Sequence, residues 1–155
     1  MKRLVLLVLC AFSFLTSCAS GDQDTAAPRK NSNATINLSG GKMKIKIGTS
    51  TFTATLHDNT TATVFKSLLP MTVSMVDLNE NEKYFDLPRS LPANASNPET
   101  IYPGDLMLYG SSTLVLFYKK FSTSYSYTRL GRIDDVTGLA AAVGSGNVTV
   151  TYEVE

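Results

Sequence analysis

The sequence lacks several residue types on which common functional sites depend. It contains no tryptophan, a single histidine (His57) and two cysteines, Cys10 and Cys18, both near the N-terminus. No Cys, Asp or Glu stands at a metal-ligand spacing from His57, so we expect no metal site and interpret His57 as a strand-end residue rather than a general base. The formal net charge is only +1, without a concentrated basic face, so we expect no nucleic-acid partner.

Motifs of nucleophilic and cofactor-dependent enzymes are also missing. The sequence has no G-x-S-x-G nucleophile elbow, no phosphate-binding glycine loop and no dinucleotide fingerprint. We therefore expect no bound cofactor, and we name no catalytic residue. The 155 residues are enough for one domain with one core.

Residues 1–17 have the pattern of a secretory leader. Lys2 and Arg3 precede an apolar run of about a dozen residues, which is too short to span a bilayer comfortably. Residues 15–18, Leu-Thr-Ser-Cys, resemble the bacterial lipobox, in which the cysteine is lipidated and the leader is cut just before it. The alternative is an ordinary signal peptide with a chance cysteine. We expect lipidation at Cys18 and anchoring of the protein in the bacterial cell envelope through this lipid.

Residues 18–41 are predicted to be a disordered tether, because they are rich in Ser, Asn, Gly, Ala and Thr and have no apolar period. Asp22 and Asp24 follow the lipidation site, where acidic residues resemble a surface-export signal of some bacteria; two acids are equally ordinary in a polar linker. We expect the outer membrane as the location and leave surface exposure open. Cys10 leaves with the leader and Cys18 carries lipid, so no disulfide supports the fold.

Residues 42–155 are predicted to form a mainly β domain. Alternation of apolar and polar residues predicts half-exposed strands at 43–47, 50–57 and 147–154. The apolar runs 106–109 and 114–118 predict a hairpin that is packed on both faces, with Gly110 and Ser111 in a type II′ turn. Further strands are expected at 72–78, at 83–85 and in the segment that ends at Ile133.

Helices and loops complete this prediction. Asp58 and Asn59 offer N-cap side chains for a short helix, and a second weak helix is expected at 136–143, capped by Gly144. Residues 87–101 are predicted to be a long irregular loop because they contain Pro88, Pro92 and Pro98, and residues 122–126 a polar loop. The expected fold is a closed β-barrel of about eight strands with two short helices.

Several short segments between about residues 43 and 140 resemble the bacterial cyclophilin-like domain family in order and spacing. They are LHDNT (56–60), LLPMT (68–72), EK (82–83), DLPR with Leu91 (86–91), GD (104–105), FY (117–118) and LGRI (130–133). The resemblance implies a closed barrel with a helix at each end, as in cyclophilins. Members of the family often occur beside or fused to flavodoxins, and their biochemical role is generally undetermined.

The chain departs from this family and from true cyclophilins at informative places. Many family members carry Trp-Gly-Asn in the central hairpin turn, where this chain has Gly110-Ser111-Ser112. Prolyl isomerases of the cyclophilin type carry Phe-His-Arg, then Phe-Met-x-Gln, and a late Trp and His, and none of these is visible here. Arg89 lies in a comparable region, but position alone assigns it no role.

Charged residues cluster around 82–89, where Glu82, Lys83, Asp86 and Arg89 follow one another. A solvated hairpin face is one interpretation. The other is a charged rim around an apolar pocket floored by aromatic residues. The candidate pocket residues are Glu82, Arg89, Tyr109, Phe117, Tyr118 and Arg129. Tyr125 and Tyr127 stand among Ser and Thr and are expected to be exposed.

The favoured function is a lipid-anchored, non-catalytic binding module for a peptide or a small ligand. Two alternatives remain open at this point. One is a peptidyl-prolyl isomerase with a degenerate active site, and the other is an accessory domain for a flavodoxin-type redox partner, which rests on the family resemblance alone.

Overall fold

The computed structural model describes residues 40–155 of the chain. The predicted leader, Cys18 and all but the last two residues of the predicted tether lie outside this range. The described elements are β1 (Lys42–Ile47), β2 (Ser50–Leu56), α1 (Thr60–Lys66), β3 (Met71–Leu78), β4 (Glu82–Asp86), β5 (Thr100–Ile101), β6 (Asp105–Tyr109), β7 (Thr113–Phe117), β8 (Phe121–Ser122), β9 (Tyr127–Ile133), α2 (Leu139–Val143) and β10 (Val148–Val154).

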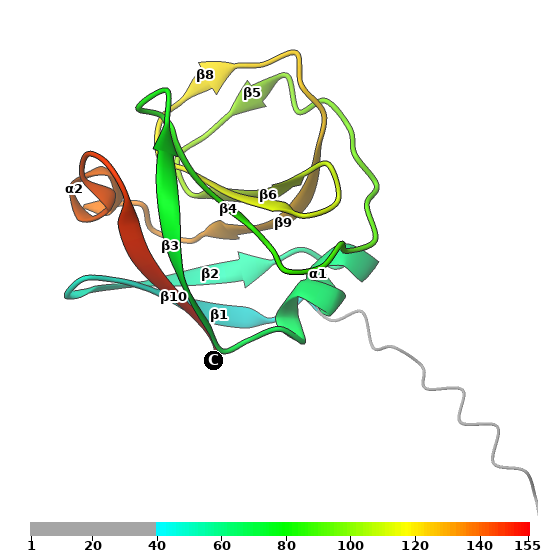
Figure 1. Ribbon diagram of the computed structural model, residues 1–155, viewed down its shortest axis with the longest axis horizontal. Helices are drawn as coiled ribbons and strands as arrows, with labels where there is room; N and C mark the ends of the chain where they lie inside the picture. Colours follow the sequence, from blue (N-terminus) through cyan, green and yellow to red (C-terminus); the bar gives the residue numbers. More distant parts are fainter. Residues whose placement is uncertain (1–39) are drawn as a thin grey trace, which may run out of the picture. The chain divides into compact units, whose positions relative to one another are not determined.

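Eight antiparallel strands form a closed barrel in the order β1-β10-β3-β4-β7-β6-β9-β2, and β2 pairs with β1 to complete it (Figure 1). Closure leaves none of these strands as a free edge that could pair with another chain. The two helices are short, with seven residues in α1 and five in α2. The predicted closed barrel of about eight strands with two short helices is therefore confirmed.

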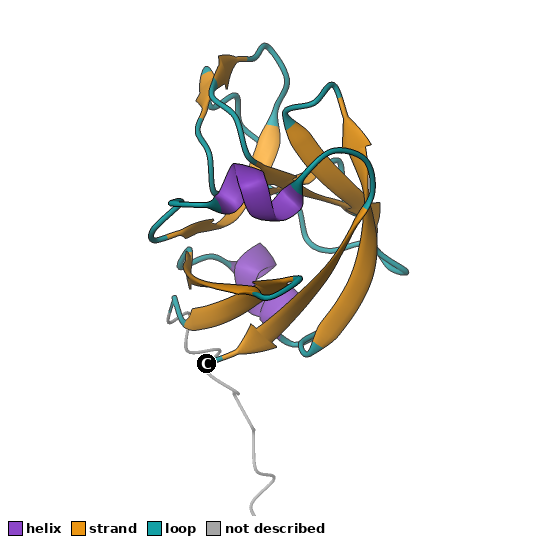
Figure 2. Ribbon diagram, turned by 90° about the vertical axis from the view of Figure 1, so that its left-hand side faces the viewer, coloured by secondary structure: helices purple, strands orange, loops and turns teal. Residues whose placement is uncertain are grey.

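The barrel interior is filled by every second side chain of its strands. In β1, Met43, Ile45 and Ile47 are buried, whereas the lysines between them face outward. Phe65 of α1 packs edge-on against Tyr152 of β10 with ring centroids 6.0 Å apart. The helices lie at opposite ends of the barrel, and Figure 2 views the molecule from the α2 side with α1 behind.

The helix boundaries follow local capping chemistry. The side chain of Asn59 accepts a hydrogen bond from the Ala62 amide at 2.8 Å, as predicted for the start of α1. The second helix is shorter than the predicted 136–143, because Gly138 adopts a left-handed conformation with φ of 81° and the helix starts only after it. Gly144 caps its end as predicted. Neither helix in residues 40–155 has the length and apolar character that a membrane crossing needs.

The central hairpin of β6 and β7 is buried on both faces, as predicted, although its turn contains three residues rather than two. Gly110, at the start of this turn, has φ of 59°, which favours glycine. Leu114 and Leu116 point into the barrel. Val115 and Phe117 face outward, into a second apolar cluster with Ile101, Met107 and Tyr127.

A two-stranded sheet of β5 and β8 covers part of this second cluster and was not predicted. The prediction placed both segments, residues 100–101 and 121–122, in or beside irregular loops. Each strand is only two residues long, too short to show an alternating pattern. In Figure 1 the two strands lie side by side at the top, beyond β6.

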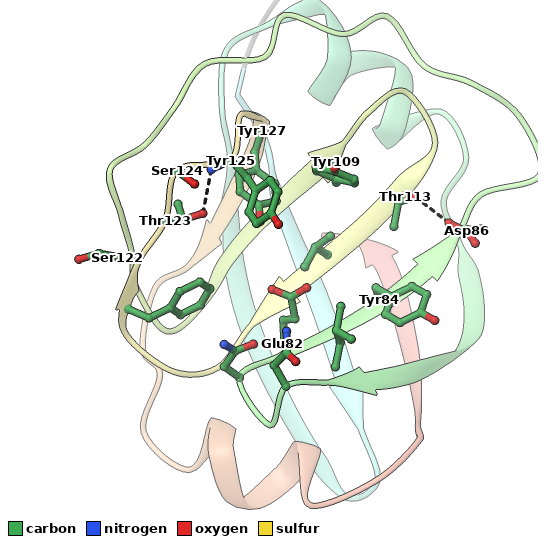
Figure 3. Close-up of a pocket in the computed structure, with 15 residues that line it drawn as sticks. Glu82, Tyr84, Asp86, Tyr109, Thr113, Ser122, Thr123, Ser124, Tyr125 and Tyr127 are labelled. Carbon is green, nitrogen blue, oxygen red and sulfur yellow. Dashed lines mark hydrogen bonds between the residues drawn. The ribbon is translucent and has the colours of Figure 1, made fainter.

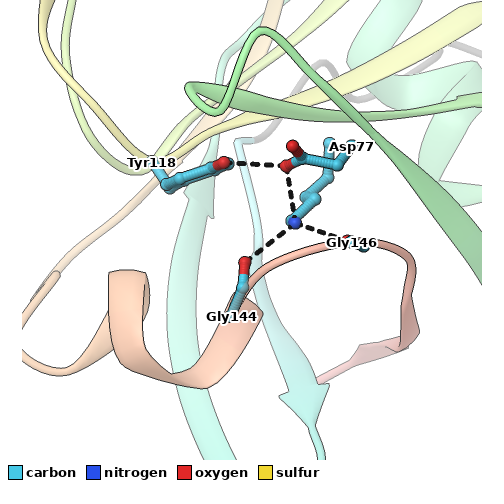
Figure 4. Close-up of polar contacts among 5 residues, drawn as sticks. Asp77, Tyr118, Gly144 and Gly146 are labelled. Atoms are coloured by element: carbon cyan, nitrogen blue, oxygen red, sulfur yellow. Dashed lines mark hydrogen bonds and ion pairs between the residues drawn. The ribbon is translucent and has the colours of Figure 1, made fainter.

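Lys83 of β4 is fully buried, which corrects its expected place in a solvated face or charged rim. Its ammonium group donates to Asp77 Oδ1 at 2.6 Å and to the carbonyl oxygens of Gly144 and Gly146 at 2.9 and 2.6 Å (Figure 4). The Tyr118 hydroxyl donates to the same Asp77 oxygen at 2.7 Å. An ammonium group has three donors, and all are used here. Lys83 thus ties β4 to the segment between α2 and β10.

Candidate functional site

A pocket of about 750 Å³ opens on the outer face of the barrel, over β4, β7 and β6. Its walls come from the turn between β3 and β4, from β8 and from the loop that leads to β9 (Figure 3). Strand alternation determines which side chains reach it. Glu82, Tyr84 and Asp86 of β4 face the pocket, as do Thr113 and Val115 of β7, while the residues between them face the barrel interior.

Tyrosine rings form one side of this pocket. Tyr109 is 47% exposed and Tyr125 is 61% exposed, and their rings meet edge-on with centroids 6.1 Å apart. Tyr127 is only 6% exposed and lies 5.6 Å from the Tyr109 ring. Exposed aromatic rings are large apolar surfaces with a polar hydroxyl at the tip, which suits them to ligand contact.

Glu82 places a carboxylate in the middle of this pocket, with Tyr125 and Tyr127 to one side and Tyr84 to the other (Figure 3). The side chain is half-buried, and within residues 40–155 it makes no ion pair or side-chain hydrogen bond. Partial burial without a compensating charge raises the pKa of Glu82 to about 6. The carboxylate is therefore largely ionised at neutral pH, although its surroundings disfavour that charge.

Two further acceptors belong to the pocket wall, on Asp86 and Asn81. Asp86, at the far end of β4, accepts a hydrogen bond from the Thr113 hydroxyl at 2.7 Å. Asn81 lies on the pocket wall, and its buried Oδ1 atom has no hydrogen-bond partner among residues 40–155. Such unsatisfied buried acceptors are uncommon in folded proteins. No Lys or Arg of the described residues lines the pocket.

The four predicted pocket residues other than the arginines divide among three places. Glu82 and Tyr109 line the pocket. Phe117 is fully buried beneath it, with its ring 5.7 Å from Phe121 and 5.4 Å from Tyr127. Tyr118 faces the opposite side and belongs to the Lys83 network. The expected exposure holds for Tyr125 and is wrong for Tyr127, which packs against Phe117.

The two predicted arginines lie elsewhere. Arg89 is exposed in the segment after β4 and does not line the pocket. Arg129 is exposed on β9 and borders a different, more polar depression with Asn94 and Thr128. Among the described residues, no arginine lines the pocket beside Tyr109 and Tyr125.

Tyr84, Val115 and Phe121 line the pocket and were missed. The alternation of β4 carried a usable signal for Tyr84, because it stands two residues from Glu82 and shares its face. Phe121 lies in a strand of two residues and had no such signal.

Within residues 40–155, no three His, Cys, Asp or Glu side chains lie close enough together to hold a metal ion. His57 is exposed just after β2, away from the tyrosine-lined pocket.

The fold of residues 40–155 and the lateral pocket define a small, closed antiparallel barrel with an open pocket on its outer wall. The model of the cyclophilin-like family matches residues 45–153, and the chain belongs to this family. Its fold is similar to the solution structure of a hypothetical protein from Archaeoglobus fulgidus, with 16% identity and a TM-score of 0.52 over 75% of this chain and 95% of that one. No curated protein matches the sequence.

Proposed function

We propose that the protein is a non-catalytic binding module whose pocket over β4, β6 and β7 receives a small ligand or part of a peptide. The observation that supports this proposal is the unpaired Glu82 carboxylate in an open pocket walled by exposed tyrosines. Large concave sites with an apolar lining and few polar groups are typical ligand sites. The absence of an arginine from this lining gives no support to isomerase chemistry of the cyclophilin type.

A binding experiment with a built-in control tests this proposal. The whole chain is screened by saturation-transfer NMR against a panel of aromatic fragments and short peptides. Binders are expected to lose signal with Tyr125→Ala, which removes an exposed ring from the pocket. They should be unaffected by Tyr102→Ala, because Tyr102 is a comparably exposed tyrosine outside the pocket. A panel without binders, or equal losses in both variants, would contradict the proposal.

The proposal includes a lipid anchor at Cys18, with the protein held at the bacterial outer membrane. It rests on the leader pattern and the lipobox-like residues 15–18. Metabolic labelling with a fatty acid in a bacterial host should mark the wild-type chain and not Cys18→Ala. The variant should be released from membranes or remain as an uncleaved precursor. Equal labelling of the two chains would rule out lipidation at this residue.

A further inference from the structure

The pocket carries negative charge and no positive charge. Glu82 and Asp86 supply its only ionisable carboxylates, and no Lys or Arg of residues 40–155 contributes to its lining. Asp86 already accepts a hydrogen bond, whereas Glu82 accepts none from a side chain of the described region. An anionic ligand would meet two carboxylates and no positively charged side chain of the described residues. A cationic ligand would supply what Glu82 lacks.

The tyrosine side of the pocket favours the same kind of ligand. Aromatic faces attract ammonium groups through the ring quadrupole, and this attraction grows when water is excluded. Tyr109 and Tyr125 keep large exposed fractions, so a ligand can still reach their rings. The volume of about 750 Å³ is much larger than an ammonium group needs, and Val115 and Phe121 add apolar wall. A fitting ligand therefore combines a cationic head with an apolar body.

We propose that this pocket binds an organic cation, a protonated amine whose ammonium group pairs with Glu82 while its apolar body lies against Tyr109 and Tyr125. The inference rests on the proposed binding function and names its ligand class. A free amine and the lysine side chain of a peptide share this chemistry.

The proposal also makes binding depend on pH through Glu82. An aliphatic amine stays protonated below about pH 9, whereas Glu82 loses its charge as the pH falls through about 6. If the protonated site binds the amine about tenfold more weakly than the ionised site, binding should weaken about fivefold between pH 7.5 and pH 5. Neither β3 nor β7 contributes a titratable group to the pocket. The titratable side chains that share it with Glu82 are Tyr84 and Asp86 of β4, Tyr109 of β6, Tyr125 of the loop before β9, and Tyr127 of β9.

Three probes that share a 2-phenylethyl group and differ in the charge of their polar group test the proposal. They are phenethylammonium, 2-phenylethanol and 3-phenylpropionate, each titrated into the whole isotope-labelled chain at pH 7.5 and at pH 5. Phenethylammonium should bind at least about tenfold more tightly than the alcohol at pH 7.5. The propionate should bind most weakly. We also compare the affinities of an acetylated tripeptide with a central lysine and of the same peptide with norleucine in place of lysine. This comparison shows whether the lysine side chain of a peptide can supply the amine.

Paired variants assign the effect to Glu82. Glu82→Gln should weaken phenethylammonium binding about tenfold and remove its dependence on pH, whereas Glu80→Gln should leave affinity within about twofold. Glu80 is exposed in the adjacent turn and does not line the pocket, so it is a matched control. Tyr125→Ala should weaken binding about fivefold.

The outcomes separate this inference from the broader function. Equal binding of the alcohol and the amine, or an unchanged affinity in Glu82→Gln, would overturn the organic-cation assignment while the pocket remains a binding site. If no probe shifts a pocket resonance while fragments of other chemistry do, the assignment falls and the binding function stands. If nothing binds in either experiment, both fall.

Discussion

Glu82 and Lys83 are neighbours in β4 and carry opposite charges, yet their side chains lie on opposite faces of the strand in different surroundings. Lys83 points to the barrel interior, is 0% exposed and has all three donors engaged. Glu82 points to the outer pocket, is half-buried and has no side-chain partner among residues 40–155. Taking a charge out of water is costly, and partners offset that cost only on the inner face. The inner charge is matched by partners within the fold, whereas the outer charge is the one that the proposed ligand would pair.

The pKa values of the carboxylates on the two faces shift in opposite directions, whereas the tyrosine pKa values rise on both. On the inner face, the Lys83 ammonium and then the Tyr118 hydroxyl lower the pKa of Asp77. Burial and the hydrogen bond to Asp77 raise the pKa of Tyr118. On the outer face, burial raises the pKa of Glu82 to about 6, and burial together with the Glu82 charge raises that of Tyr127.

The largest expected effect tests whether the floor of the pocket is a true core. Phe117→Ala should lower the free energy of unfolding by about 3–5 kcal/mol, because it removes a fully buried ring that contacts Phe121 and Tyr127. Chemical denaturation gives this value, with Tyr102→Ala as a partly exposed control. If the denaturation midpoint of Phe117→Ala equals that of the wild type, the β5–β8 sheet does not pack on this ring.

The next prediction concerns a substitution that removes the positive charge of the inner face. Lys83→Met keeps similar bulk but removes the ammonium donor from two carbonyl oxygens and from Asp77, which retains only the Tyr118 hydroxyl, so the free energy of unfolding should fall by about 1–3 kcal/mol. Asp77 has a lowered pKa in the folded protein, so its contribution is present above about pH 4 and is lost as the pH falls through the folded pKa.

The difference between wild type and Lys83→Met should therefore shrink in acid, which urea unfolding at pH 7 and pH 3 measures. Lys66→Met is the control, since the Lys66 side chain lies outside the Lys83 network. A constant difference at both pH values would show that packing, rather than the ion pair, sets the effect.

A smaller effect of opposite sign is expected on the outer face. The folded pKa of Glu82 is about 6, above its ordinary value of 4.5, so the folded protein binds more protons between these values. The contribution of Glu82 to the free energy of unfolding is fully present below about pH 4.5 and is lost as the pH rises through 6. Glu82→Gln should therefore raise the free energy of unfolding at pH 7 by at most about 1 kcal/mol, allowing for solvent screening.

Urea unfolding at pH 7 and pH 4.5 measures this gain, which should vanish at the lower pH. Glu80→Gln should show no gain at either pH. Destabilisation of Glu82→Gln at pH 7 would mean that Glu82 has a structural partner.

The last prediction is that the protein has no effect on the rate of prolyl isomerisation. Cyclophilin-type catalysis lowers a barrier of about 18–20 kcal/mol for rotation of the prolyl amide and needs a fixed donor beside an apolar slot. Arg89 and Arg129 both lie outside the pocket. We expect no acceleration of X-Pro isomerisation in a protease-coupled assay. Cyclophilin-like activity that Arg89→Ala abolishes would favour the degenerate isomerase, and activity that survives this change would next be tested with Arg129→Ala.

Sequence patterns predicted most of the barrel because strand alternation is a local signal. Met43, Ile45 and Ile47 show it clearly, and the buried hairpin followed from its continuous apolar runs. The same rule would have corrected one error, since Phe117 and Tyr118 are consecutive and cannot face the same pocket.

Other features depend on distant partners. The carbonyl groups that hold Lys83 lie 61 and 63 residues further along the chain, so no local pattern distinguishes this lysine from a solvated one. Alternation likewise places Glu82 and Tyr84 on one face without saying whether that face is inside or outside. Of the residues that the sequence placed at a pocket, Glu82 and Tyr109 line the pocket over β4, β6 and β7, whereas Arg89 and Arg129 lie elsewhere.

The pKa of Glu82 itself, followed through its side-chain carboxyl resonance by NMR, is the most direct measurement of the unpaired charge. The free protein should give a value of about 6. Saturation with phenethylammonium should lower the pKa of Glu82 by about one unit. The amine is expected to bind the ionised site about tenfold more tightly than the protonated site, and by linkage the bound amine then favours ionisation of Glu82 by the same factor. A value near 4.5 in the free protein, unmoved by the amine, would contradict both the unpaired charge and its role in binding.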